Sequence, residues 1–428
     1  MKSNYNSFTN PSAPEISFQV SNSIKPRQEE IYNEAKPLIL AIVSPYPPSK
    51  GTLNEYAFHL VEQFKIKSDI KEIHIITDIL PDNKIYPSEG RPEHIYIHPV
   101  WSFNETNTTL KIKKTVDTIN PDVVLYNLQF LSFGDNKVSA TLGLLGPLMT
   151  KWSGIPSMVL LHNIIETVDY GSAGITQNPV MAWFYNMVGK QITKLILSAN
   201  LVGVTIPKYV HILEKKYGCK NIVLLPHGSY KSNKVPDFDF NPEIRNILTF
   251  GKFGTYKKVE NLIEAMKKVR QEVHFQIELT IAGTDNPNVK GYLEEVREKY
   301  KSCHGLHFKG YVEEEDVANL FSSSTIVAFD YTSTTGSSGV LHQAGSYGKS
   351  VMLPNIGDLK ELITEEGYVG AYFKPNSIDE MAEAMKKLLT DDQHRKVIAK
   401  QNYVAANGLP IGDIADWYVM HFKRLVVK

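Results

Sequence analysis

The run LILAIVSP at residues 38–45 is apolar at nearly every position and ends in a Ser-Pro turn. A continuous apolar strand of this kind is typical of a parallel sheet with both faces covered. Similar runs return later, and helix-length segments separate most of them: EIHIIT (72–77), DVVLYN (122–127), SMVLLHN (157–163) and LVGVTI (201–206). This alternation of buried strand and amphipathic helix predicts an open, doubly wound parallel α/β sheet.

The pattern starts again after a polar stretch with prolines, KSNKVPDFDFNPE (231–243). Its apolar runs lie at 245–253, 275–283, 306–312, 324–330, 350–354 and 370–373, with helical segments at 257–270, 288–301, 313–322, 339–348 and 377–390. We therefore expect two Rossmann-like doubly wound domains, with the site in the cleft beyond the carboxyl ends of their strands. The predicted parts are a flexible extension (1–36), a first domain (37–230), a linker (231–244), a second domain (245–410) and a C-terminal helix (411–428) that crosses back to the first domain.

The composition excludes several classes of protein. The chain has 46 basic and 46 acidic residues, a formal net charge of zero, which argues against a general nucleic-acid binder. Its two cysteines, Cys219 and Cys303, are far apart and predict neither a disulfide scaffold nor a cysteine-based zinc site. We find no membrane-spanning run and no apolar signal segment, so we expect a cytoplasmic protein.

Two stretches of the second half carry candidate chemistry. In GKFGTYKKVENLIEA (251–265), Lys252 comes after an apolar run, and Lys257 and Lys258 stand at an expected helix start. Cations oppose the dipole there, so the cluster favours an anionic partner, although a solvated charged turn explains it equally well. In DYTSTTGSSGVLHQAGSYGKSVMLP (330–354), small residues precede a helix near Gly339. Free N–H groups there suit an anion, and a capped helix without a ligand is the alternative.

Four stretches together resemble the retaining glycosyltransferases of family 4, which have the GT-B fold. GKFGTYKKVENLIEA is similar to that family's G-R-L-x3-K-G-x3-L-I-E-A segment, and VLLPHGSY (223–230) to its turn between the domains. FKGYVEEEDVANLFSSSTIVAF (308–329) resembles the stretch that holds the nucleotide base. TGSSGVLHQAGSYGKSVML (335–353) resembles the E-x7-E signature, but both acidic positions are substituted, by Thr335 and Gln343.

The resemblance implies a site and a reaction. Lys252 and Lys257, with the backbone of Gly336–Gly339, would stabilise the leaving diphosphate, and His162 in LLHN (160–163) would contact the transferred sugar. Gln343 would hold the ribose as an amide, and neither a cofactor nor a metal is expected. The remaining expected donor contacts are Lys50 and Gly51 from the first domain and Val312, Thr335, Ser337, Ser338 and Val340 from the second.

The implied function is retaining transfer of a sugar from a UDP- or GDP-sugar to a saccharide or lipid-linked acceptor. A non-catalytic sugar-nucleotide-binding subunit and a GT-B phosphorylase or epimerase are the alternatives. His227 is a candidate for holding the turn between domains, and Glu166 for the acceptor side. MAWFYNMVG (181–189) fits either internal packing or a peripheral membrane contact at the inner face.

Overall fold

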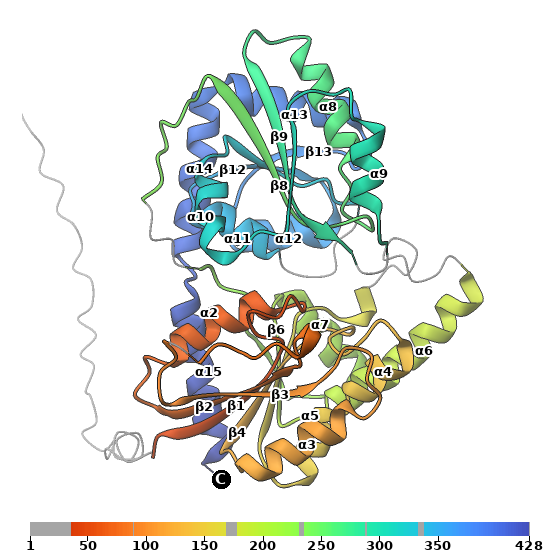
Figure 1. Ribbon diagram of the computed structural model, residues 1–428, viewed down its shortest axis with the longest axis vertical. Coiled ribbons are helices and arrows are strands. Elements are labelled where there is room, and N and C mark those ends of the chain that lie inside the picture. Colours follow the sequence, from red (N-terminus) through yellow and green to blue (C-terminus); the bar gives the residue numbers. More distant parts are fainter. Residues whose placement is uncertain are drawn as a thin grey trace, which may run out of the picture. The chain divides into compact units, whose positions relative to one another are not determined.

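The structure is a computed structural model that describes residues 36–88, 90–167, 178–230, 235–286, 289–332 and 338–427. Two parallel sheets form the framework of this part of the chain, and each is covered by helices (Figure 1). The predicted fold class is therefore confirmed. Residues Pro37–Lys428 form a unit separate from Met1–Lys36, and the predicted extension at 1–36 lies outside the described residues except for Lys36.

The first sheet has seven strands in the order β3-β2-β1-β4-β5-β6-β7. Strand β1 is central: Ile42 pairs with Ile75 of β2 on one side and with Leu125 of β4 on the other, both in parallel. The strands are β1 Leu38–Val43, β2 Ile70–Asp78, β3 Ile95–Trp101, β4 Val123–Leu128, β5 Ser157–Leu161, β6 Leu201–Val204 and β7 Ile222–Leu224. The helices are α2 Asn54–Phe64, α3 Thr108–Ile119, α4 Lys137–Gly143, α5 Gly146–Trp152, α6 Pro179–Ile196 and α7 Pro207–Tyr217, with short 3-10 turns at Pro81–Asn83 and Ile165–Thr167.

Both faces of this sheet are buried, which explains why its strands are apolar at consecutive positions. On one face, Val43 and Val159 pack in a core with side chains of α3, α6 and α7. On the other face, Leu40 and Ile42 pack in a core with α2 and the last helix, α15 Ile411–Val426. Helix α15 thus belongs to the core of the first domain, as predicted, and Figure 1 shows it beside the first sheet.

The second sheet has six strands in the order β10-β9-β8-β11-β12-β13, again all parallel. Helices α8, α9 and α13 supply the core on one face, and α10, α11, α12 and α14 contribute to the core on the other. The strands are β8 Ile244–Phe253, β9 Gln276–Asp285, β10 Leu306–Gly310, β11 Ile326–Ala328, β12 Ser350–Pro354 and β13 Ala371–Phe373. The helices are α8 Glu260–Arg270, α9 Tyr292–Lys299, α10 Glu314–Ser322, α11 Gly339–Ser346, α12 Gly357–Glu365, α13 Ile378–Thr390 and α14 Asp392–Asn407.

Some predicted boundaries were wrong where the sequence alone offered a choice. Lys252 lies inside β8 rather than after it, because β8 pairs with β9 as far as Phe253–Asp285. Lys257 and Lys258 precede α8, which begins at Glu260, since Lys257 instead forms a bridge with Tyr331. Strand β3 was missed because it is mostly only partly buried and His98 and Pro99 interrupt its apolar run.

Candidate functional site

The loop after β1 brings a cation to the second domain. Lys50 is exposed, and its Nζ lies 3.8 Å from a carboxylate oxygen of Glu313 and 4.0 Å from the centre of the Tyr311 ring. A Cβ on Gly51 would lie 2.7 Å from Pro45 Cβ, so only glycine allows the loop to fold this closely. The next residue, Thr52, accepts a hydrogen bond of 3.0 Å from Lys252 Nζ.

Lys252 and Lys257 hold two positive charges together at the end of β8. A Cβ on Gly251, whose φ is 143°, would lie 3.0 Å from Lys257 Nζ, so the ammonium folds over the backbone of the strand end. Lys257 Nζ also lies 4.6 Å from the centre of the Tyr331 ring. Burial and the nearby Lys257 lower the pKa of Lys252. Among the described residues neither lysine forms an ion pair, which leaves a charge that an anion would neutralise.

His162 follows β5 and joins a buried polar group at the carboxyl edge of the first sheet. Its Nε2 lies 2.7 Å from Asn127 Oδ1, and its ring meets the Tyr56 ring edge-on at a centroid distance of 4.9 Å. Burial, with a smaller effect of His227, lowers the pKa of His162 to about 3. The imidazole is therefore neutral at physiological pH.

The start of α11 brings three predicted contacts into the described structure. Ser338 is the N-cap residue but makes no side-chain capping bond, and Gly339 packs against His227, whose Nε2 would lie 3.3 Å from an added Cβ. Val340 is half-buried and packs at the edge of the core under α11. The predicted contacts at Thr335, Gly336 and Ser337 lie outside the described residues.

Gln343 meets a carboxylate from the first domain. Its Nε2 donates a hydrogen bond to Glu55 Oε1 of α2. Burial and the nearby Glu314 raise the pKa of Glu55 to about 7. His59 Nε2 lies 3.0 Å from Glu314 Oε1, so Glu55, His59 and Glu314 form a cluster with potential metal-ligating atoms within 4.8 Å of one another. Because its members already pair with one another and with Gln343, hydrogen bonding explains this cluster without an ion.

Three other predicted residues lie at different places. Val312 is half-buried between β10 and α10. His227 is buried and stacks on His342 at a centroid distance of 5.1 Å, with its Nδ1 2.9 Å from Gly228 O. The hypothesis of an acceptor role for Glu166 gains no support, because Lys216 and Tyr217 of α7 both donate hydrogen bonds to its Oε1.

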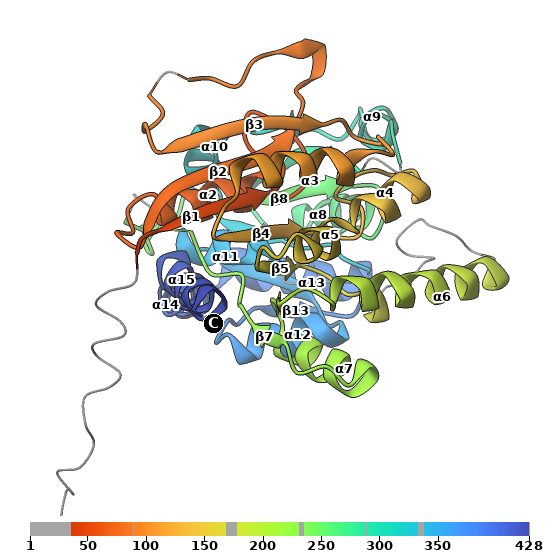
Figure 2. The ribbon, with the colours of Figure 1, turned by 90° about the horizontal axis from the view of Figure 1, so that it is seen from below.

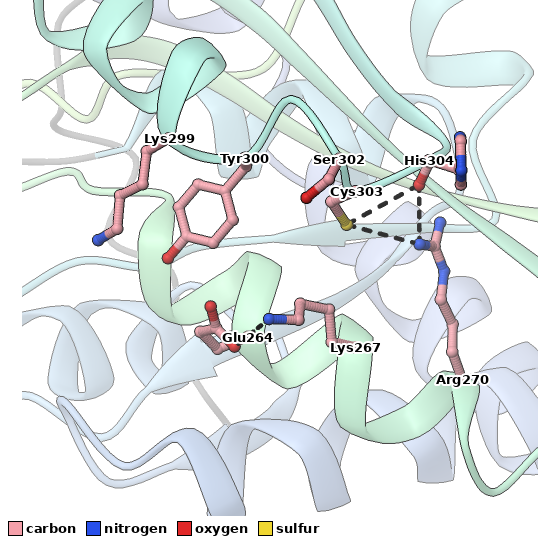
Figure 3. A pocket seen from close by; sticks show the side chains of 8 residues that line it. All are labelled: Glu264, Lys267, Arg270, Lys299, Tyr300, Ser302, Cys303 and His304. Carbon is pink, nitrogen blue, oxygen red and sulfur yellow. Dashed lines mark hydrogen bonds and ion pairs between the residues drawn. The ribbon is translucent and has the colours of Figure 1, made fainter.

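A separate hollow of about 530 Å³ lies on the second domain along α8 and the turn after α9. Its lining includes Lys267, Arg270, Lys299 and one carboxylate, Glu264, to which Lys267 Nζ donates a hydrogen bond of 2.9 Å (Figure 3). Arg270 Nη1 donates to His304 O at 2.8 Å. Lys267 is thus paired with a carboxylate, whereas neither Lys252 nor Lys257 has a carboxylate partner among the described residues.

Sequence reasoning missed Thr52, Glu55, Tyr56 and Asn127, all of which contact predicted site residues. The signal for Asn127 was its position as a polar residue at the end of a buried strand, where ligands of parallel sheets bind. Nothing local marks Glu55, because a glutamate in the first turn of a helix is ordinary.

Comparisons with known proteins found a matching family model, a related sequence and solved structures of similar fold. Residues 231–404 match the family model of Glycosyl transferases group 1. A relative described as an uncharacterized glycosyltransferase of Methanocaldococcus jannaschii is 26% identical over 274 residues, which cover 60% of this chain and 68% of the relative.

Two solved structures are similar in fold across most of both chains. Sucrose-phosphate synthase from Thermosynechococcus elongatus has a TM-score of 0.69 at 16% identity, with 90% of this chain and 98% of that chain covered. HepE of Anabaena, in complex with UDP and glucose, has a TM-score of 0.64 at 15% identity, with 90% and 99% covered. Residues 231–404 therefore match the Glycosyl transferases group 1 model, and the two-domain fold of the chain is similar to that of these solved structures.

Proposed function

We propose that this protein is a glycosyltransferase that moves a sugar from a UDP- or GDP-sugar to a saccharide or lipid-linked acceptor, with retention of configuration. The observation that carries the proposal is the pair of lysines, Lys252 and Lys257, gathered at the end of β8 without a described carboxylate partner. The Glycosyl transferases group 1 match over 231–404 and the complex of HepE with UDP-glucose support a nucleotide-sugar as the anion.

In this reaction the bond between the sugar and the diphosphate breaks, and its electron pair goes to the diphosphate oxygen. Lys252 and Lys257 are placed to stabilise that charge, and fixed cations in a water-poor site do so without reorganisation. The acceptor oxygen then bonds the sugar, and its proton passes to the leaving phosphate. This front-side route needs no protein nucleophile and no metal or cofactor. Lys50 and Gly51 border the diphosphate from the first domain, and His162 contacts the sugar.

Thermal-shift measurements with UDP, GDP, ADP and their sugars test the proposal. A ligand that binds the native state raises the melting temperature in proportion to ln(1 + [L]/Kd), so the correct donor gives a concentration-dependent rise. Radiolabelled donor then reports transfer to acceptors or slow hydrolysis. A protein that responds to none of these nucleotides is not a nucleotide-sugar enzyme.

A second candidate is a non-catalytic subunit that binds sugar-nucleotides. It is favoured by Gln343, because an amide paired with Glu55 replaces a carboxylate of the family signature. The two candidates differ in one measurement. The subunit binds donor but gives neither transfer nor hydrolysis with any acceptor.

We also propose that α6 contacts a membrane surface at the cytoplasmic face. Val180, Trp183 and Met187 lie three and four residues apart, and their side chains are 70%, 67% and 41% exposed. The sequence of α6 has two lysines and no acidic residue. Figure 2 shows the first half of this yellow-green helix projecting from the domain. An exposed apolar stripe with flanking lysines suits an anionic lipid surface. Among the described residues no helix is long and apolar enough to cross a membrane.

A further inference from the structure

Asn127 is the next-to-last residue of β4, where it is a buried polar residue in a largely apolar strand with only 1% of its surface exposed. Its Nδ2 lies 3.0 Å from Ser44 Oγ and 3.4 Å from Leu53 O, and its Oδ1 lies 2.7 Å from His162 Nε2. One side chain thus links the ends of β1 and β4, the start of α2 and the residue after β5. These elements meet at the carboxyl edge of the first sheet.

The contacts of the amide determine which of its atoms faces the histidine. The Leu53 carbonyl can only accept a hydrogen bond, so the amide atom beside it is the NH₂ group. The other amide atom, Oδ1, can only accept, and it faces His162 Nε2. A neutral imidazole carries a proton on one nitrogen, and here that nitrogen is Nε2.

We propose that Asn127 is a positioning residue that holds His162 as the neutral Nε2–H tautomer, so that Nδ1 presents its lone pair to the ligand in the cleft. The inference rests on the proposed function for the identity of that ligand. The tautomer itself does not depend on the function.

The surroundings of the ring agree with a fixed neutral acceptor. Burial lowers the pKa of His162. The neighbouring His227, whose ring lies at a centroid distance of 6.1 Å, lowers it further. The Tyr56 ring packs edge-on against the imidazole and limits its rotation. Within the described ranges Nδ1 has no hydrogen-bond partner, and the side chain is only partly buried.

The lone pair on His162 Nδ1 can accept a hydrogen bond only from a group that carries a proton. A hydroxyl of the transferred sugar can donate to Nδ1, whereas a sugar carboxylate at the same place has no proton to give and would face a lone pair. Sites built around a hydroxyl discriminate strongly against analogues that lack it. We therefore expect a donor whose sugar offers a hydroxyl to His162.

Nitrogen-15 NMR of histidine-labelled protein tests the tautomer directly. The His162→Gln variant identifies the His162 signals by their loss. We expect a protonated Nε2 and a non-protonated Nδ1 at pH 7 in the wild-type protein. An Nδ1–H tautomer or an imidazolium at that pH would overturn the proposal.

Three substitutions separate positioning from folding. Asn127→Asp keeps an acceptor at Nε2–H but adds a negative charge, so the acid limb of the kcat profile should rise by about one pH unit or more. Asn127→Leu removes the hydrogen bond to His162 Nε2, so we expect a detectable Nδ1–H tautomer. We also expect kcat to fall about tenfold, as for the loss of one hydrogen bond, while the KM for the donor changes little. Ser44→Ala removes one hydrogen bond of the Asn127 amide, so we expect it to lower kcat less than Asn127→Leu does.

Asn221→Leu is the matched control. Asn221 Nδ2, like Asn127 Nδ2, donates to two acceptors, here the backbone carbonyls of Leu197 and Ala199, but it lies away from His162. Equal loss of kcat and no change of tautomer in the Asn127→Leu and Asn221→Leu variants would reduce Asn127 to a structural residue. A confirmed tautomer without any transfer would instead leave this inference standing and reject the proposed function.

Discussion

At the scale of single residues, the site depends on side chains whose charges are set by burial. Lys252 and Lys257 keep two ammonium groups close together, and Lys252 is bonded only to the neutral Thr52 among described side chains. His162 is neutral and only partly exposed, and Asn127 and Tyr56 contact its ring rather than a carboxylate. We propose that the two lysines bind the charged diphosphate and that His162 contacts a neutral hydroxyl.

Removing either lysine should weaken nucleotide binding. We expect Lys252→Ala and Lys257→Ala each to raise the Kd for the nucleotide diphosphate by about 10- to 100-fold, since a charge-assisted hydrogen bond contributes about 1.5–3 kcal/mol. Isothermal titration measures this. Lys267→Ala in the hollow of Figure 3 is the control, because its ammonium is already paired with Glu264. An equal effect of Lys267→Ala would place the nucleotide in that hollow instead.

Removing His162 should separate turnover from binding. We expect His162→Ala to lower kcat by about tenfold or more, with the nucleotide Kd nearly unchanged, because the contact proposed for this side chain is with the sugar and not with the diphosphate. Initial rates with saturating donor, beside titration with the free nucleotide, measure both quantities. An unchanged kcat would remove His162 from the mechanism.

At the scale of elements, two helices differ in what their apolar residues do. Helix α15 buries Ile414, Tyr418 and Phe422 against α2 and the first sheet. Helix α6 buries its second half, including Ile192 and Ile196, but exposes the stripe of its first half. Packing accounts for the apolar residues of α15, whereas the described residues leave those in the first half of α6 exposed.

The stripe of α6 predicts lipid binding. We expect the wild-type protein to float with liposomes rich in anionic lipid and the Trp183→Ser variant to float several-fold less, because it loses an exposed aromatic anchor. Trp152→Ser on α5 is the control, since Trp152 is 73% exposed but lies outside the stripe. Equal flotation of wild type and Trp183→Ser, or none by either, would contradict membrane docking through α6.

The packing of α15 predicts a large loss of stability. Phe422 is fully buried, and its ring lies 5.8 Å from that of Phe64 in α2. We expect Phe422→Ala to lower the free energy of unfolding by about 3–5 kcal/mol. Urea denaturation measures it, with Trp417→Ala on the exposed side of α15 as the control. A loss below about 1 kcal/mol would show that α15 contributes little to the first domain.

At the scale of the whole molecule, buried histidines connect the two domains. His162 follows β5, His227 lies in the turn after β7, and His342 belongs to α11; His227 contacts both of the others. Burial lowers the pKa of His162 to about 3 and that of His227 to about 4, and it also lowers the pKa of His342 well below its ordinary value. The folded protein therefore excludes protons from this junction.

The three histidines at this junction predict that the folded protein loses stability in acid. Above about pH 6.5 the histidines are neutral in both states and contribute no pH dependence. As the pH falls toward 4 the unfolded chain binds protons that the folded chain does not, so stability falls by about 1.4 kcal/mol per pH unit for each histidine. We expect His227→Asn to reduce the slope of unfolding free energy between pH 6.5 and 5 by about that amount.

Comparing the pH slope of the unfolding free energy between wild type and His227→Asn separates the effect of His227 from that of buried carboxyl groups, whose effect has the opposite sign. Burial raises the pKa of Glu55 to about 7 and that of Glu366 to about 8, so their contributions are present at low pH and lost as the pH rises through those values. These groups remain in the variant. His211→Asn on α7, an exposed histidine, is the control, and an equal change of slope in both variants would contradict the prediction.

The sequence by itself determined the two parallel-sheet domains, because LILAIV and the later apolar runs can be buried on both faces only between layers of helices. It also predicted Lys252, Lys257 and His162 as site residues, the two lysines near the end of a strand of the second sheet and His162 at the end of a strand of the first. Only the tertiary structure paired Gln343 with Glu55 and His162 with Asn127, at separations of 288 and 35 residues. Such contacts depend on how distant elements pack, and no local spacing or periodicity records them.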